Sequence, residues 1–384
     1  MFVGGLGGGR YMGSGHIAEL LRWEMSQRAG DRTATFAVRQ GSVAAEAVYQ
    51  IERTDAAGTV AVVDVYGYQP RMVLDAESTP ARALTRVITL ALTVLAGVLI
   101  WTAAAARSSR RRKSAPQMLQ LLLCLLMLFA LGAYFLTAVY ALVDALWLAL
   151  RPSGNGPGSA PVISWPQWAV LIGAVTGLLA PNLRTRLTEA GELYQRIMRY
   201  TWTASVRNRL TGDLQDLLDR VNQRPEIQTI HLVGFSFGAL LALDTLLPTS
   251  GRPAPIQQIR SLVTIGCPFE LIEMLHPAYG RARTPATPQP FTWINVYQPI
   301  DVLASTFGAG HTRTRPAVPI LADGTHRHPD MNIAWNAEFT LTPVNFLMLP
   351  SFYSHGQYWD QNTGCRSAFG SIVDALYSDT PALR

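Results

Sequence analysis

The sequence predicts an α/β fold, in which a mostly parallel sheet flanked by helices is interrupted by an inserted transmembrane helical hairpin. Three observations predict it. Strand-like runs of β-branched and apolar residues occur in both parts of the chain, for example at 59–68 and 259–265. The run at 227–235 ends in a glycine-rich turn and passes directly into an Ala/Leu-rich helical pattern. Between the two parts lie uncharged apolar stretches that are long enough to span a membrane.

The composition excludes several classes of protein. Only 15% of the 384 residues are charged and 49% are hydrophobic, which excludes a disordered chain. Much of the formal net charge of +6 comes from one cluster, RSSRRRK at 107–113. The positive charge is therefore not spread over a basic face, which argues against a nucleic-acid-binding protein. Three cysteines without a C-x-x-C pair predict neither a disulfide framework nor a zinc site.

The chain is expected to divide into three segments. Residues 1–80 and 182–384 are predicted to form one domain, and residues 84–181 are predicted to be an insertion that contains membrane helices. If both ends of the chain build one sheet, the bilayer must be crossed an even number of times. Two crossings satisfy this condition, while a third, shorter and glycine-rich run could span, re-enter or lie in the interface. The predicted membrane helices are 84–106, 117–149 and 162–180.

These segments predict an integral membrane protein of a bacterial cytoplasmic membrane. The basic loop at 107–113 favours a cytoplasmic position for that loop, which would place the flanking soluble parts outside. Exporting residues 1–80 without a signal sequence argues against that orientation. The side of the membrane that carries the soluble domain is therefore left open.

The motif G-F-S-F-G at 234–238 is the strongest sign of chemistry. Gly234 and Gly238 remove side chains where a strand and a helix crowd together, and the turn between them projects the Ser236 hydroxyl above the sheet edge. The backbone N–H of Phe237, at the start of the helix, then points toward an oxyanion formed by attack on a carbonyl. This is the geometry of a nucleophilic serine, although a structural Gly-Ser turn would show the same letters.

A serine nucleophile needs a base and an acid, and Asp301 is the predicted acid. For this topology, the expected order along the chain is serine, then acid, then histidine. The run 291–297 reads as a strand, and Asp301 follows its carboxyl end, where open α/β sheets assemble their sites. The alternative is an ordinary loop aspartate that caps a turn.

His355 is the predicted base. It lies after the strand-like run 339–349 and before a final helix at 367–377, as the expected order requires. The alternative is the pair His326 and His328, with aspartates nearby, which we interpret as a polar surface loop rather than a metal site. The remaining histidines are assigned to a strand, a helix start or loops: His231, His16, His276 and His311.

Four stretches together resemble the serine-hydrolase branch of the α/β-hydrolase superfamily, and its lipase-like members in particular. They are VGFSFGALLALD, TIGCPFEL, WINVYQPIDVLAS and YSHGQYW. The resemblance implies an α/β-hydrolase-type sheet and a Ser-His-Asp triad in which Ser236 is the nucleophile, Asp301 the acid and His355 the base. It also implies esterase or lipase-like cleavage of an acyl ester or lipid, without a metal or organic cofactor.

The N-terminal run also resembles this family, except at one residue. The run FVGGLGG at 2–8 is similar to the early strand and loop that donate the second oxyanion N–H, and Gly4 stands where that family carries a histidine. The donor is a backbone group, so Leu6 or Gly5 is its candidate. No antiparallel strand pair precedes this run, which leaves open how that edge of the sheet is built.

Two other functions compete with this hypothesis. A hydrolase fold without activity would act as a membrane scaffold. A nucleotide-binding or glycosyl-transfer domain is suggested by the G-x-G-x-x-A match of Gly13, Gly15 and Ala18 before a helix, because glycine-rich turns at helix N-termini bind phosphates. The acidic residue expected after such a motif to bind a ribose is missing.

Overall fold

A computed structural model gives the fold of the chain. It describes residues 1–4, 13–29, 33–43, 46–70, 197, 199–249, 258–276, 278–287, 290–299, 301, 303–308, 318–335, 355, 357–359 and 368–377. The chain divides into two compact units. The first consists of Met1–Met72, Arg111–Gln120 and Arg199–Arg384, and the second of Val73–Arg110 and Leu121–Met198. All the elements named below belong to the first unit.

The fold is α/β, with one sheet of eight strands among the described residues. The strands are β1 (Phe2–Val3), β2 (Thr35–Val43), β3 (Glu46–Asp55), β4 (Gly58–Tyr68), β5 (Ile230–Phe235), β6 (Ile259–Ile265), β7 (Thr292–Tyr297) and β8 (Met331–Ala334). The helices are α1 (Ser14–Arg28), α6 (Ala204–Asn222), α7 (Phe237–Leu246), α8 (Phe269–Leu275), the 3₁₀ helix η1 (Gln357–Trp359) and α11 (Ala368–Tyr377).

Both parts of the chain contribute to the sheet, as the sequence predicted. The strand order is β2-β3-β4-β1-β5-β6-β7-β8. The short strand β1 lies between β4 and β5 and is parallel to both, so that Phe2 pairs with Gly67 on one side and Val233 on the other. From β4 to β8 all neighbours are parallel, and their carboxyl ends therefore meet at one edge of the sheet.

The sheet edge beyond β4, whose structure the sequence did not predict, is formed by two further antiparallel strands. Strands β2 and β3 pair antiparallel, and β3 pairs antiparallel with β4. These strands follow β1 in the chain instead of preceding it. Strand β2 runs from Thr35 to Val43, and β3 was not predicted.

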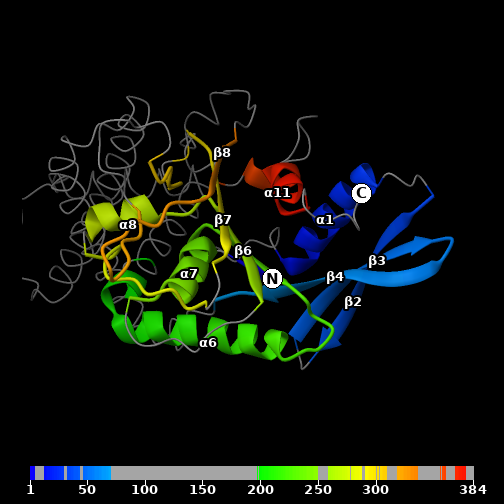
Figure 1. The fold of residues 1–384 in the computed structure, drawn as a ribbon, viewed down its shortest axis with the longest axis horizontal. Helices are drawn as coiled ribbons and strands as arrows, with labels where there is room; N and C mark the ends of the chain where they lie inside the picture. The colour runs from blue at the N-terminus through cyan, green and yellow to red at the C-terminus, as the bar shows by residue number, and fades with distance from the viewer. Residues whose placement is uncertain are drawn as a thin grey trace, which may run out of the picture. The chain divides into compact units, whose positions relative to one another are not determined.

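Helices cover both faces of the sheet (Figure 1). On one face α1 and α11 lie next to each other, and their apolar side chains form a core with Phe2, Phe235 and other residues of the strands. On the other face every residue of α7 is buried, and α6 packs against α7. The buried residues of α6 recur at helical spacing: Leu210, Leu214, Leu217, Leu218 and Val221.

Several predicted elements agree closely with the structure. The runs 259–265 and 291–297 are β6 and β7, the predicted terminal helix is α11, and the run from 59 is β4. The strand predicted at 339–349 lies outside the described residues. Strand β8, which was not predicted, pairs with β7 at the far edge.

The predicted membrane helices 84–106, 117–149 and 162–180 also lie outside the described residues. Within the part of the chain that the structure does describe, no helix has both the length and the apolarity that a bilayer crossing needs. The inserted hairpin therefore stays a prediction from sequence.

Candidate functional site

Ser236 lies in a strained turn between β5 and α7. Its φ of 55° and ψ of −125° fall in a region that non-glycine residues rarely adopt. The Ser236 amide donates to the Ile265 carbonyl at 2.8 Å, and its carbonyl accepts the Ala239 amide at 3.0 Å. The turn is thus fixed to the end of β6 and to the first turn of α7, and the sequence prediction of its strand and helix is correct.

Both glycines of the motif are required by close packing. A Cβ on Gly234 would lie 2.5 Å from the Ala239 Cα, inside the turn itself. A Cβ on Gly238 would lie 2.2 Å from the carbonyl oxygen of Val3 and 2.5 Å from that of Gly4. The start of α7 therefore rests directly on the backbone at the end of β1, which no larger residue would allow.

His355 and Asp301 form a hydrogen-bonded pair. Nδ1 of His355 lies 2.7 Å from Oδ2 of Asp301, whose side chain is fully buried. The other oxygen, Oδ1, accepts the amide of Leu303 at 2.9 Å. Because a carboxylate only accepts, His355 carries its proton on Nδ1 when it is neutral, and Nε2 is left with a lone pair.

The His355 ring lies beside the Ser236 turn. It stacks on the ring of Phe235, the residue before Ser236, with 5.1 Å between the ring centroids. On the β6 side, Gly266 has φ +58°, and a Cβ there would lie 2.9 Å from the His355 Cε1. The imidazole therefore occupies space that the glycine leaves open at the carboxyl ends of β5 and β6.

The third contact of the predicted triad is not formed in the structure. Nε2 of His355 is buried and has no hydrogen-bond partner, and no hydrogen bond joins it to the Ser236 hydroxyl among the described residues. Catalytic hydrogen bonds in enzymes without substrate are often long and shorten when substrate binds. The site thus presents a basic nitrogen without a partner next to a strained serine.

Polar contacts fix the loop that carries Asp301. The Ser305 hydroxyl donates to the Cys267 carbonyl at 2.6 Å and accepts the Glu270 amide at 2.8 Å. The Asn295 side chain, on β7, donates to the Ser305 carbonyl at 2.9 Å. The loop is therefore tied to β7 and to the segment that follows β6, which fixes Asp301 within hydrogen-bond distance of His355.

The candidate oxyanion donors are only partly described. Phe237 is the first residue of α7, and the first N–H groups of a helix have no acceptor within the helix. Its side chain is fully buried and packs edge-on against Tyr200, with 4.7 Å between centroids. Gly5 and Leu6 lie outside the described residues, so their role stays a prediction.

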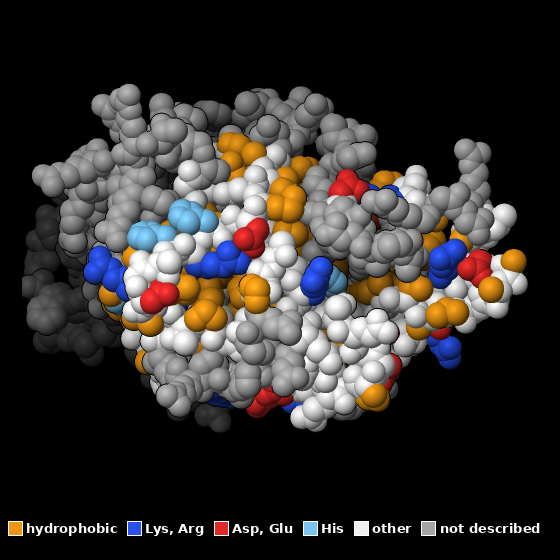
Figure 2. All heavy atoms as spheres, in the orientation of Figure 1, with side chains coloured by type: hydrophobic (Ala, Val, Ile, Leu, Met, Phe, Trp, Pro, Cys, Tyr) orange, Lys and Arg blue, Asp and Glu red, His pale blue; other side chains and the backbone are white. Residues whose placement is uncertain are grey.

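The remaining described histidines have other environments. Nδ1 of His231 hydrogen-bonds the Ser261 hydroxyl at 2.8 Å, and burial lowers its pKa to about 4, which agrees with a structural role in β5. His326 and His328 are exposed and stacked, with 6.3 Å between centroids. Figure 2 shows histidine side chains side by side on the outer surface, near basic and acidic groups.

Among the described residues, the side chains near that pair have partners other than a metal. The carboxylate of Asp330 binds the Arg327 guanidinium and accepts the Trp293 amide at 2.7 Å. In the ranges that the structure describes, no three His, Cys, Asp or Glu side chains could hold a metal ion together. The interpretation of 323–330 as a polar surface loop agrees with this geometry.

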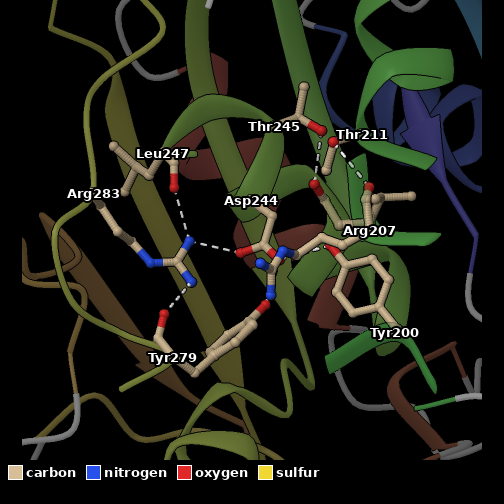
Figure 3. A network of polar contacts seen from close by, with 9 residues as sticks. Tyr200, Arg207, Thr211, Asp244, Thr245, Leu247, Tyr279 and Arg283 are labelled. Carbon is tan, nitrogen blue, oxygen red and sulfur yellow. Dashed lines mark hydrogen bonds and ion pairs between the residues drawn. The ribbon is translucent and has the colours of Figure 1, made fainter. Parts of the chain in front are cut away.

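A buried ion pair anchors the far end of α7 (Figure 3). Asp244, two turns after Ser236, lies 2.6 Å from the Arg283 guanidinium, and both side chains are buried. The carboxylate also accepts the hydroxyls of Tyr200, at 2.6 Å, and Tyr279. Burial alone would lower the pKa of Arg283, but the negative charge of Asp244 raises it above its usual value. The network thereby ties α7 to two other segments of the chain.

Packing explains one glycine of the G-x-G-x-x-A match, Gly15 in the first turn of α1. A Cβ on Gly15 would lie 2.9 Å from the ring of Tyr49 on β3, so helix and sheet approach too closely for a side chain. Gly13 precedes the helix, and its carbonyl accepts the amides of His16 and Ile17. A Cβ on Gly13 would meet no atom within 4 Å, so packing does not explain this glycine.

Sequence reasoning missed several side chains that hold the site together, Tyr358 above all. The Tyr358 hydroxyl donates to Oδ2 of Asp301 at 3.0 Å. It stands three residues after His355, a spacing that puts two side chains on the same side of a helical turn. That spacing was the available signal, and it does not distinguish Tyr358 from an ordinary core residue.

In comparisons with known proteins, no family model, no curated protein and no solved structure matches this chain.

Proposed function

We propose that this protein is a membrane-anchored serine hydrolase of the α/β-hydrolase type, which cleaves an acyl ester or lipid through Ser236, His355 and Asp301. One observation carries the proposal: a hydrogen-bonded histidine–aspartate pair beside a serine held at positive φ. The proposal is supported by the positions of Ser236 after β5 and Asp301 after β7, because these parallel strands end at the edge of the sheet where α/β folds place their sites.

The mechanism would be acyl transfer in two steps. The Ser236 oxygen attacks the ester carbonyl while Nε2 of His355 takes its proton, and Asp301 holds the imidazolium through Nδ1. The Phe237 amide, with that of Leu6 or Gly5, stabilises the oxyanion. His355 then returns the proton to the departing alcohol, which leaves an ester on Ser236. Water, deprotonated by the same nitrogen, hydrolyses that ester and regenerates the serine.

The substrate class rests on the sequence of the insertion. Residues 84–181 contain uncharged stretches of spanning length, and attachment of the chain to a bilayer favours an acyl ester or lipid that partitions into it. In a membrane preparation, the full-length chain is expected to stay in the pellet after extraction with alkaline carbonate. Its release into the supernatant would contradict membrane anchoring and leave the hydrolase proposal standing.

A fluorophosphonate probe tests the hydrolase proposal. The probe is expected to label the folded full-length protein on the peptide that contains Ser236, and Ser236→Ala should abolish labelling. Ser26→Ala, which changes a serine of α1, is the matched control and should leave labelling intact. A folded protein that is not labelled would overturn the proposal and favour a catalytically silent scaffold.

A further inference from the structure

Tyr358 contacts both members of the histidine–aspartate pair. Its hydroxyl is buried, lies 3.0 Å from Oδ2 of Asp301 and accepts the Gln298 amide at 2.9 Å. Its ring is placed by packing, because a Cβ on Gly266 would lie 3.1 Å from the Tyr358 Cε2. The ring also lies edge-on to that of Phe235, with 6.1 Å between centroids.

The hydrogen bonds from Gln298 to Tyr358 and from Tyr358 to Asp301 have a fixed direction, because the first donor is a backbone N–H. A backbone N–H can only donate, so the Gln298 amide occupies a lone pair of the Tyr358 oxygen. The single hydroxyl proton is then directed to Asp301, whose Oδ2 accepts it together with the proton on Nδ1 of His355. Every bond in the series therefore points toward the carboxylate.

These hydrogen bonds fix the orientation of the Asp301 carboxylate toward His355. With Oδ2 held by Tyr358 and Oδ1 held by the Leu303 amide, the carboxylate cannot rotate away from the imidazole. Burial raises the pKa of Tyr358 well above 10, so the phenol keeps its proton throughout the neutral range. The hydroxyl acts as a permanent donor.

We propose that Tyr358 is a positioning residue of this site, which orients Asp301 and, through it, keeps Nε2 of His355 free to accept a proton. The proposal rests on the proposed function for its catalytic meaning. The only hydrogen bond of Tyr358 to the proposed triad within the described residues is the one to Asp301, and the positioning acts through that bond.

Two titratable groups contact the His355 ring within the described part of the chain. They are Asp301, from the loop after β7, and Tyr358, from η1. The ring's other described neighbours, Phe235 and Gly266, carry no charge. A change in the hydrogen bonding of Asp301 is therefore expected to alter the pH dependence of proton transfer at this site.

The test is the Tyr358→Phe variant of the full-length protein, which removes one hydroxyl. The rate of Ser236 labelling by a fluorophosphonate is measured across pH. We expect the plateau rate to fall about tenfold, as for the loss of one hydrogen bond to a charged group. The midpoint of the rise in rate with pH should move upward, because Asp301 without this donor holds a protonated His355 more tightly.

Tyr200→Phe is the matched control. It removes a buried tyrosine hydroxyl that donates to a different buried carboxylate, Asp244, at 2.6 Å. A loss of general stability would affect both variants, whereas only Tyr358→Phe is expected to change the rate and the pH midpoint. If the two variants give the same profile, Tyr358 has a structural role only and the inference is overturned.

A second measurement does not depend on activity. The low-field proton resonance of the His355 Nδ1–H, assigned by its loss in His355→Gln, is expected to shift in Tyr358→Phe and to stay in place in Tyr200→Phe. An unlabelled wild-type protein would end the hydrolase proposal, but this resonance would still report on Tyr358. An unchanged resonance in Tyr358→Phe would overturn the positioning role.

Discussion

Asp301→Asn is expected to slow the labelling of Ser236 by about 10³- to 10⁴-fold, the size of effect seen when the acid of a Ser-His-Asp triad is amidated. The side chain keeps its shape, and its carbonyl can still accept the Leu303 amide. An amide NH₂ facing Nδ1 of His355 would, however, require that nitrogen to accept. The imidazole proton would then move to Nε2, and the base could no longer take a proton from the serine.

The control for this variant is Asp323→Asn. Asp323 is an exposed loop carboxylate that accepts the Thr325 amide at 2.8 Å, so the chemical change is the same in a place that does not touch the site. Its labelling rate should equal that of the wild type. Equal rates for the two variants would mean that Asp301 does not orient the base.

Arg283→Met is expected to lower the free energy of unfolding by about 3–5 kcal/mol, because it leaves the buried carboxylate of Asp244 without its counter-charge. The guanidinium also donates to the carbonyls of Leu247 and Tyr279, which would lose these bonds. Denaturant titration of the folded protein measures the change.

Two further variants distinguish the effect of the uncompensated buried charge on stability from the effect of losing the arginine side chain itself. Arg39→Met removes an exposed pair with Glu52, 3.6 Å apart, and should change the free energy of unfolding by less than about 1 kcal/mol. Adding Asp244→Leu to Arg283→Met should recover part of the loss, since the uncompensated charge is gone while the two tyrosine hydroxyls remain without an acceptor. A mild effect of Arg283→Met, similar to that of Arg39→Met, would contradict this role of the network.

The parts of the fold that sequence predicted well have strong local signals. Strand β6 and helix α11 were placed almost to the residue, because β-branched runs and apolar residues at helical spacing reflect burial directly. Strand β3 was missed because charged and polar residues interrupt its apolar positions. Strand β8 is short and mostly exposed at the sheet edge, which leaves little apolar pattern to recognise.

For the site, too, the sequence predicted contacts that follow from the order of residues along the chain and missed those without a local signal. The order of Ser236, Asp301 and His355 along the chain predicted a histidine–aspartate contact that the structure contains. The role of Tyr358 depends on two contacts between residues far apart in sequence, with Gln298 and Asp301, and thirteen tyrosines offer no local means of choosing among them. The hydrogen bond between Ser236 and His355 was also predicted, and the structure brings the two elements together without forming it.

During turnover, Ser236 is expected to become acylated with the help of the His355–Asp301 pair. The intact mass of the full-length protein is measured after quenching during turnover of an activated ester such as a p-nitrophenyl ester. One acyl group per chain is expected, located on the Ser236 peptide and absent from Ser236→Ala and His355→Gln. An acyl group on another residue, or hydrolysis that persists in Ser236→Ala, would contradict this expectation.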